Sequence, residues 1–275
     1  MDTTAAVLPA VIAGYDVVRQ LGEGGHGRCY LVRPPARLGL ADEFVVLKMF
    51  NDRVSEQAFE RGVRELRAFA AVPSEHLVHV YDAVLEASFG YAMEHFPLGS
   101  LAAPARSPSR GEVLTALEHA ARAAHALHEA GLAHGDLRPG NILLSQDAAG
   151  AIGGRLADPE LRRVLTPGTA LTGMGRASSL EFTDPTLLAG ARPSRRTEVW
   201  ALGATIHRAL SGAGLHGELP DPQPLLAIRR LLTGRPQVYP GLAPGAAALV
   251  HDCVADGGNR IATAAEVADR LAALR

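Results

Sequence analysis

Cysteine is nearly absent from this sequence: Cys29 and Cys253 are the only two among 275 residues. Two thiols cannot build a disulfide framework or a four-cysteine zinc site. Charge of one sign is also lacking, because 27 Lys and Arg residues stand against 29 Asp and Glu residues, a formal net charge of −2. Neither the basic surface typical of nucleic-acid binding nor an acidic tail is therefore expected.

Long hydrophobic runs are missing as well. No apolar stretch approaches the roughly 20 residues that a membrane-spanning helix requires, and the first residues have no basic region of the kind that opens a signal peptide. We expect a cytoplasmic protein with free thiols and no membrane contact. With 47% apolar and 20% charged residues over 275 positions, the chain is long enough for a large core and two lobes.

The first part of the chain, residues 1–96, alternates short apolar runs with turns and contains one amphipathic helix. After Pro97 the pattern becomes mainly helical. Expected strands are Tyr15–Gln20, Arg28–Arg33, Phe44–Phe50, Val78–Leu85 and Phe89–Glu94. Expected helices are Ser55–Ala71, Glu112–Ala130, Glu198–Ser211 and a last helix that begins with the capping box Thr263–Glu266. Residues 159–196 are polar and read as irregular.

Glycines cluster between the first two strands, in the segment 22–27 (GEGGHG). Glycine lets backbone N–H groups approach phosphate oxygens because no Cβ blocks them; a flexible hairpin is the alternative interpretation. Lys48 lies in the apolar strand FVVLKMF. It is either an edge lysine that reaches water or an anion clamp held by a carboxylate of the following helix.

A proline-stiffened loop with an apolar strand follows at 134–144 (HGDLRPGNILL). Asp136 can accept a proton from an attacking hydroxyl, and Asn141 can hold a cation through its side-chain oxygen. Asp158, at the end of a later strand, adds a carboxylate suited to Mg²⁺. Together with the glycines and Lys48, these are the parts of a phosphoryl-transfer site.

These motifs resemble, in order over residues 15–275, those of a protein kinase domain of the bacterial, eukaryotic-like Ser/Thr type. LGEGGHGRCYLV is similar to the glycine-rich loop, VVLK to the strand with the phosphate-binding lysine, HGDLRPGN to the catalytic loop, and EVWALG to a helix after the activation segment. The resemblance implies a bilobal α+β fold. Residues 1–96 would form a small lobe with an antiparallel sheet and one helix, and residues 97–275 a larger, mainly α-helical lobe.

The resemblance also implies catalytic roles. Asp136 matches the catalytic base, and Arg138 stands at the position of the catalytic-loop lysine. Lys48 matches the lysine that orients the ATP phosphates. Glu65 best matches its carboxylate partner, with Glu60 as the second choice.

The same matching implies the cofactors ATP and Mg²⁺. Asn141 and Asp158 are the implied metal ligands. The residues implied to surround the nucleotide are Gly22, Gly24, Gly27, Cys29, Val46, Lys48, Met93, Glu94, Phe96 and Leu143.

Two departures lie at the centre of the family pattern. Gly135 stands where most such kinases have an arginine that grips a phosphorylated activation loop, so activation by loop phosphorylation is not expected. Pro159 and Glu160 replace the Phe and Gly that usually follow the metal-binding aspartate. Because a residue before proline is biased away from helical geometry, we expect Asp158 to be extended.

Further departures affect residues that support the site. Thr186 replaces a glutamate that normally pairs with Arg260, and Asp184 is the expected substitute. Glu198 replaces an aspartate that braces the catalytic loop. Ser179 falls where Ser/Thr kinases keep a threonine near the base.

The resemblance favours a Ser/Thr protein kinase that acts on a hydroxyl of a protein or peptide. Two alternatives stay open: a pseudokinase that serves as a nucleotide-binding scaffold or allosteric regulator, and a kinase of small molecules or biosynthetic peptides. A regulatory partner protein is a further expectation, as the source of an input signal.

Overall fold

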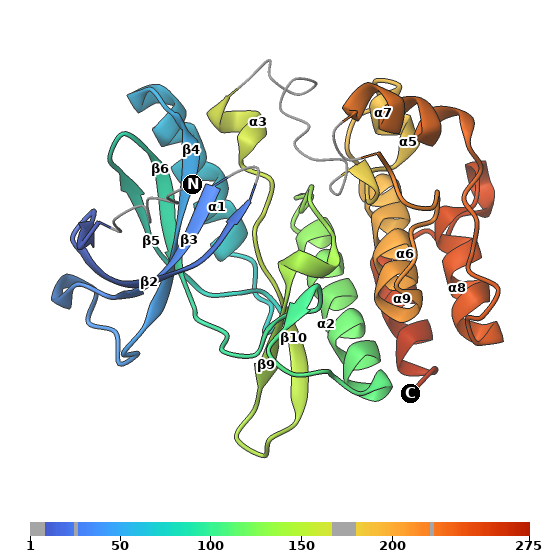
Figure 1. The fold of residues 1–275 in the computed structure, drawn as a ribbon, viewed down its shortest axis with the longest axis horizontal. Helices are drawn as coiled ribbons and strands as arrows, with labels where there is room; N and C mark the ends of the chain where they lie inside the picture. The colour runs from blue at the N-terminus through green and yellow to red at the C-terminus, as the bar shows by residue number, and fades with distance from the viewer. Residues whose placement is uncertain (1–8, 25–26, 167–179, 221–222) are drawn as a thin grey trace, which may run out of the picture. The chain divides into compact units, whose positions relative to one another are not determined.

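The computed structural model describes residues 9–24, 27–166, 180–220 and 223–275. The chain divides into two compact units. The first contains strands β1 to β6 and helices α1 and α3, and the second contains the remaining elements (Figure 1). The predicted α+β class, with strands in the first part and mostly helices in the second, is confirmed.

The first unit is built on one antiparallel sheet with the strand order β1-β2-β3-β4-β6-β5. Its elements are β1 (Val11–Ile12), β2 (Tyr15–Gly24), β3 (Gly27–Arg33), a 3₁₀ turn (Ala36–Leu38), β4 (Val45–Arg53), α1 (Glu56–Ala70), β5 (Val80–Leu85), β6 (Ser88–Met93) and α3 (Arg162–Leu165). All five predicted strands are present. The second half of β2 extends further than predicted, into the glycine cluster.

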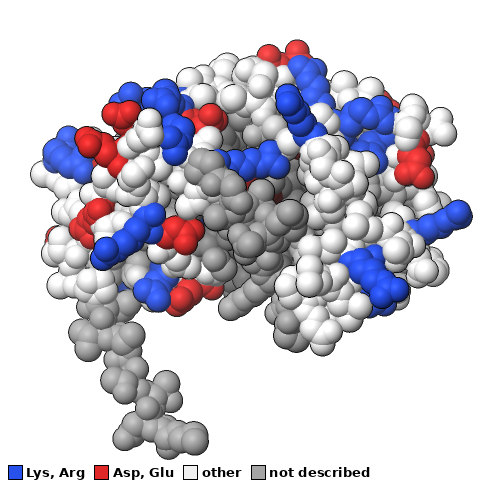
Figure 2. Space-filling view, turned by 90° about the horizontal axis from the view of Figure 1, so that it is seen from above, with Lys and Arg blue, Asp and Glu red and all other residues white. Residues whose placement is uncertain are grey.

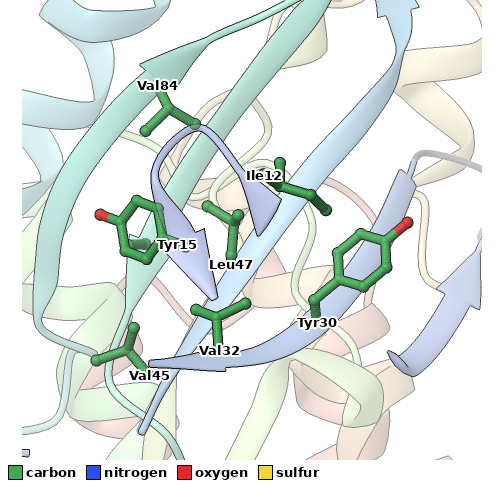
Figure 3. Packing of buried hydrophobic residues seen from close by; sticks show 8 residues of the cluster. Ile12, Tyr15, Tyr30, Val32, Val45, Leu47 and Val84 are labelled. Carbon is green, nitrogen blue, oxygen red and sulfur yellow. The ribbon is translucent and has the colours of Figure 1, made fainter. Parts of the chain in front are cut away.

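One face of this sheet carries a hydrophobic cluster. Side chains alternate between the two faces along each strand, so every second residue of β3 and β4 contributes. The buried members are Ile12, Tyr15, Tyr30, Val32, Val45, Leu47, Val84 and Ala92 (Figure 3). The residues that alternate with the cluster along each strand therefore point their side chains to the opposite face of the sheet.

The second unit combines helices with a small sheet in the order β10-β9-β7-β8. Its elements are β7 (Gly99–Ser100), β8 (Ala103–Pro104), α2 (Arg110–Glu129), a 3₁₀ turn (Pro139–Asn141), β9 (Ile142–Gln146), β10 (Ile152–Leu156), α5 (Pro185–Leu188), α6 (Arg195–Ser211), α7 (Pro224–Thr233), α8 (Pro244–Val254), a 3₁₀ turn (Gly257–Asn259) and α9 (Ala264–Ala272). Helix α6 lies among α2, α8 and α9 (Figure 1).

Helix α6 is the buried centre of the second unit. Ser194 caps it, since its side chain accepts a hydrogen bond from Thr197 N. The helix therefore begins at Arg195, three residues before the predicted start at Glu198, and ends at Gly212, whose φ of 72° suits glycine. Trp200, with 1% exposure, and its neighbours along α6 are buried.

A buried ion pair joins two distant segments of the second unit. Arg260 Nη1 lies 2.5 Å from Asp184 Oδ2, and their side chains are 8% and 1% exposed. Asp184 also caps α5 by accepting from Thr186 N at 2.9 Å. Asp184 therefore takes the place that the family pattern gives to a glutamate at 186, as predicted.

Other predictions need adjustment. Residues 159–196 include the short helices α3 and α5 rather than irregular chain alone. Thr263 accepts from Glu266 N, which forms one half of the predicted capping box. Ser179 lies outside the described residues. Among the residues described, no helix is both long and apolar enough to cross a membrane.

A substitution at Gly27 tests how closely strands β3 and β4 approach each other. A Cβ at Gly27 would clash with the Met49 carbonyl oxygen, whereas one at Gly24, its partner across β2 and β3, would meet nothing within 4 Å. We expect Gly27→Ala to lower the free energy of unfolding by about 1–3 kcal/mol because β3 and β4 must separate. Gly24→Ala should stay within about 0.5 kcal/mol. Denaturant unfolding measures both, and equal losses would contradict the steric explanation.

Candidate active site

The register of the first sheet brings predicted nucleotide residues into two adjacent rows. Gly22 pairs with Cys29, and Cys29 pairs with Lys48. In the next row, Val46 pairs with Met93. Directly opposed residues of antiparallel strands share a face, and residues two apart along β4 do too. All five therefore lie on the face opposite the hydrophobic cluster of Figure 3.

The three glycines of the loop have different surroundings. Gly27 is buried, and the backbone of Met49 leaves no room for a Cβ there. Gly22 and Gly24 are exposed, and a Cβ on either would meet nothing within 4 Å. Packing against the described residues thus requires glycine at position 27. At positions 22 and 24, the same residues would leave room for a larger side chain.

Lys48 is half-buried in the middle of its strand. Its Nζ lies 5.6 Å from the centroid of the Phe50 ring, a cation–π distance. Glu65 and Glu60 are exposed on α1, and neither forms an ion pair within the described part of the chain. The pairing of Glu65 with Lys48 stays a prediction.

Helix α1 instead contacts the short helix α3. Arg61 Nε donates to Val164 O at 3.0 Å. A Cβ at Gly62 would meet Leu165 Cδ2 at 2.7 Å, so glycine permits this close approach. Residues after Glu160 therefore pack on α1, within the first unit.

Three more residues implied to surround the nucleotide, Met93, Glu94 and Phe96, lie at the end of β6 or just after it. Met93 is buried and ends that strand, and Glu94 N donates to His79 O at 3.0 Å. Phe96 is half-buried in the second unit, where its carbonyl accepts from Gly99 N. Leu143 is half-buried on β9, opposite Arg155 on β10.

The loop 134–141 converges on the carboxylate of Asp136. Asn141 Nδ2 donates to Asp136 Oδ2 at 2.9 Å and to Asp136 O at 2.7 Å. Arg138 Nε donates to Asp136 Oδ2 at 3.1 Å. Asn141 is 1% exposed, whereas the Asp136 side chain keeps 21% exposure. The predicted base Asp136, the Arg138 cation and the predicted metal ligand Asn141 thus lie together, and the Asp136 side chain is still accessible to solvent.

His134 connects this loop to the segment that carries Asp158. Its Nδ1 accepts from Asp136 N at 3.3 Å, so Nε2 carries the proton that it donates to Ala157 O at 2.9 Å. Burial lowers the pKa of His134, which agrees with a neutral ring. Ala157 N in turn donates to Asn141 O at 2.9 Å. Asp158 directly follows Ala157 in the chain. The predicted metal ligands Asn141 and Asp158 therefore lie on two segments that are hydrogen-bonded to each other.

Asp158 does not adopt the expected extended backbone. Its φ is 62°, in the left-handed region that non-glycine residues rarely occupy. The chain is hydrogen-bonded on both sides of Asp158, from Ala157 N to Asn141 O and from Glu160 N to His134 O. The extended preference that Pro159 favours is therefore not realised in this folded segment.

Glu198 braces the loop from α6, as the resemblance implies. Its Oε1 accepts from Gly135 N at 2.5 Å, and its Oε2 lies 2.7 Å from His128 Nε2. Burial raises the pKa of the Glu198 carboxyl, but the bonds from His128 and Gly135 outweigh burial and hold it below the usual value. A second residue of α6, Thr205, donates to Leu137 O at 3.2 Å. Helix α6 therefore fixes the loop at two points.

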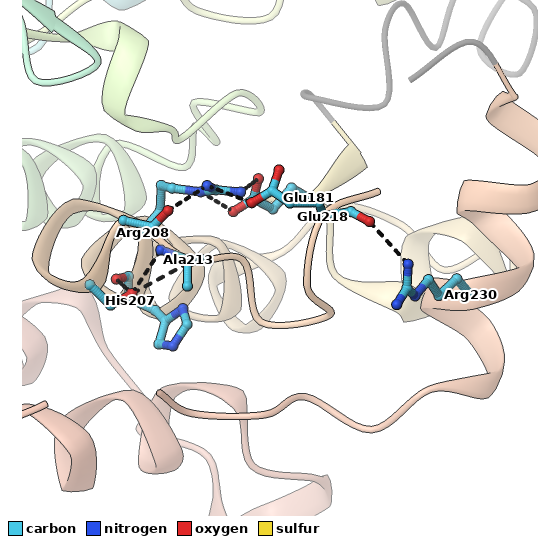
Figure 4. Close-up of polar contacts among 8 residues, drawn as sticks. Glu181, His207, Arg208, Ala213, Glu218 and Arg230 are labelled. Carbon is cyan, nitrogen blue, oxygen red and sulfur yellow. Dashed lines mark hydrogen bonds and ion pairs between the residues drawn. The ribbon is translucent and has the colours of Figure 1, made fainter. Parts of the chain in front are cut away.

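A pocket of about 570 Å³ adjoins the loop within the second unit. Arg138, Pro139 and Gly140 form one wall, and Glu181 and Arg208 line another. Arg208 grips Glu181 through two bonds of 2.7 and 2.6 Å (Figure 4), and this bonding raises the pKa of Arg208. The wall charges are thus paired, which leaves the pocket's apolar lining to receive a ligand.

The surface shows no dominant charge on the face in view, where acidic and basic side chains are interspersed (Figure 2). Within the described ranges, no group of three or more His, Cys, Asp or Glu side chains is arranged to hold a metal ion.

Sequence reasoning missed two connections. Nothing in the helical pattern of residues 112–130 indicates that His128 has a partner 70 residues away. His134 was part of the matched loop, yet its bond to Ala157 depends on how the strands return. Both connections are tertiary, so no local signal could have revealed them.

Comparison with known proteins agrees with this geometry. The family model described as the protein kinase domain matches residues 15–230. Serine/threonine-protein kinase PknJ of Mycobacterium tuberculosis is 29% identical over 96% of this chain and 46% of its own length. PknK of the same organism is 30% identical over 94% of this chain and 23% of its own. The DNA damage-responsive serine/threonine-protein kinase RqkA of Deinococcus radiodurans is 31% identical over 74% and 30%.

The chain spans less than half the length of these curated relatives. The family model, by contrast, covers most of the chain, including the glycine loop, Lys48 and the loop 134–141. The chain belongs to the protein kinase domain family.

Proposed function

We propose that this chain is an active Ser/Thr protein kinase domain, which transfers the γ-phosphoryl group of ATP to a hydroxyl of a protein or peptide. One observation carries the proposal: the Asp136 carboxylate is oriented by Asn141 and Arg138 while it stays accessible to solvent. A base must be fixed in direction and reachable by the hydroxyl that it deprotonates.

The first unit fits a nucleotide. Gly22 and Gly24 leave the space that a Cβ would fill open above the sheet, which suits close approach of phosphate oxygens to backbone N–H groups. Lys48 lies in the same row as Gly22 and Cys29, so its charge is positioned to orient phosphates. Val46 and Met93, both nearly buried, supply an apolar surface for the base in the adjacent row.

The second unit fits Mg²⁺. Asn141 donates its amide N–H groups to Asp136, which points the side-chain oxygen elsewhere, and no described residue donates to that oxygen. Oxygen donors from an amide and a carboxylate are what Mg²⁺ prefers. Asn141 and Asp158 would therefore hold the ion, which would neutralise charge on the ATP phosphates.

The loop residues would then divide the chemistry. Asp136 would orient the acceptor hydroxyl and take its proton, and Arg138 would stabilise the negative charge of the moving phosphoryl group. Glu198 would act through the loop backbone, as a positioning residue. The pocket beside Arg138 is the place where a segment of the acceptor protein would bind.

Asp136→Asn tests the proposed base. We expect Mg²⁺-dependent ADP release, and phosphate transfer to a protein acceptor, to fall by about 10²-fold or more, because asparagine cannot take the proton. Asp256→Asn is the matched control, since Asp256 is an exposed carboxylate of the same unit. Intact mass of the acceptor and of the chain itself follows the transferred phosphate.

The result separates the alternatives. Equal ADP release by wild type and Asp136→Asn, with Mg-ATP still raising the melting temperature of both, would replace the kinase by a nucleotide-binding scaffold. Transfer to a metabolite but not to any protein or peptide would assign the third alternative, a small-molecule kinase.

Glu198→Gln tests the brace. Each carboxylate oxygen of Glu198 accepts one hydrogen bond, from Gly135 N or from His128 Nε2. Glutamine replaces one of these oxygens by an NH₂ donor, so one of the two bonds is lost. The free energy of unfolding should therefore fall by about 1–3 kcal/mol. Turnover should fall about tenfold, which corresponds to about 1.4 kcal/mol in the barrier. Glu129→Gln, which alters an exposed partner of Arg195, should change neither quantity. Unchanged turnover in a destabilised Glu198→Gln would show that the brace serves folding alone.

A further inference from the structure

The two central departures from the family pattern meet in space. Gly135 has a φ of 84°, and a Cβ built on it would lie 2.7 Å from Glu160 Cβ and 3.4 Å from Glu160 Cγ. Contacts under 3.0 Å between such atoms are essentially not seen. The side chain of residue 160 therefore occupies the space that a side chain at 135 would need.

The backbone of Glu160 is also tied to the loop. Glu160 N donates to His134 O at 2.9 Å, next to Gly135. At the other end of the segment 157–160, Ala157 O accepts from His134 Nε2 and Ala157 N donates to Asn141 O. Three hydrogen bonds thus anchor both ends of a segment of four residues.

Between these anchors lie a strained residue and a rigid one. Asp158 keeps its φ of 62°, a conformation that persists only where the surroundings impose it. Pro159 fixes its own φ and offers no backbone donor. The conformation of Asp158 therefore depends on the hydrogen bonds at Ala157 and Glu160. Glu160 can take its place beside the loop only because residue 135 has no side chain.

We propose that Glu160 is a positioning residue that works as a steric pair with Gly135. The first atoms of its side chain pack into the space above Gly135, and its N–H bond to His134 seats the segment on the catalytic loop. This contact holds the backbone of Asp158, one of the two proposed metal ligands, in its left-handed conformation. The inference rests on the proposed function where it concerns Mg²⁺, whereas the steric pair itself does not.

A four-protein cycle tests the pair: wild type, Gly135→Ala, Glu160→Gly and the double variant. Gly135→Ala alone should lower Tm by at least about 4 °C, because the new methyl group meets Glu160 Cβ. In the Glu160→Gly background the same substitution should cost less than half as much, since only the backbone strain at φ 84° remains. Equal costs in the two backgrounds would overturn the steric pair, and Tm is readable whether or not the protein turns over ATP.

Turnover tests the positioning role. Glu160→Gly should raise the Mg²⁺ concentration for half-maximal ADP release at least fivefold while the KM for the protein acceptor stays unchanged. Glu160→Gln is the matched variant, because it keeps the Cβ and Cγ atoms that pack against Gly135; its Mg²⁺ requirement should lie closer to that of the wild type than to that of Glu160→Gly. A Glu160→Gln variant as impaired as Glu160→Gly, or an unchanged Mg²⁺ requirement in Glu160→Gly, would overturn the role. The Asp136→Asn comparison decides separately whether the proposed function itself fails.

Discussion

The second unit depends on one buried carboxylate. Glu198 is 4% exposed, and a carboxylate so placed is costly unless its oxygens are hydrogen-bonded. One oxygen accepts from the catalytic-loop backbone at Gly135 and the other from His128 on α2. Helix α6 is buried from Thr197 to His207, and α2 lies against it. The loop that carries Asp136 and Asn141 inherits its position from this arrangement.

Close backbone approaches form the second constraint. Glycine is required at 27 by the carbonyl of Met49, at 154 by the backbone of Ala116 on α2, and at 135 by Glu160. The open positions Gly22 and Gly24 are different, because a Cβ on either would meet nothing within 4 Å among the residues that the structure describes. The same residue type thus serves internal packing at some sites and leaves room for a ligand at others.

Periodicity and motif order were sufficient to predict the strands around Lys48, the helical second part and the convergence of Asp136, Arg138 and Asn141. They failed where tertiary contacts decide. The sign of φ at Asp158 follows from hydrogen bonds at its flanks rather than from Pro159, and α6 starts earlier because Ser194 caps it. The prediction that Asp184 could substitute for residue 186 succeeded because the resemblance identified Arg260 as a residue that needs a carboxylate, and Asp184 is a carboxylate two residues away from position 186.

At three places in the second unit, a departure from the family pattern is compensated by a contact with another residue. Glu160 fills the space left by Gly135, Asp184 binds the arginine that Thr186 cannot, and both oxygens of the longer Glu198 have partners. Two of these compensations, at Gly135 and Glu198, act on the loop that carries Asp136, whereas the Asp184–Arg260 pair joins α5 to the segment before α9. In that loop the Asp136 carboxylate is oriented by two donors, Asn141 and Arg138. The supports differ from the family pattern, and the loop geometry that they hold agrees with the proposed phosphoryl transfer.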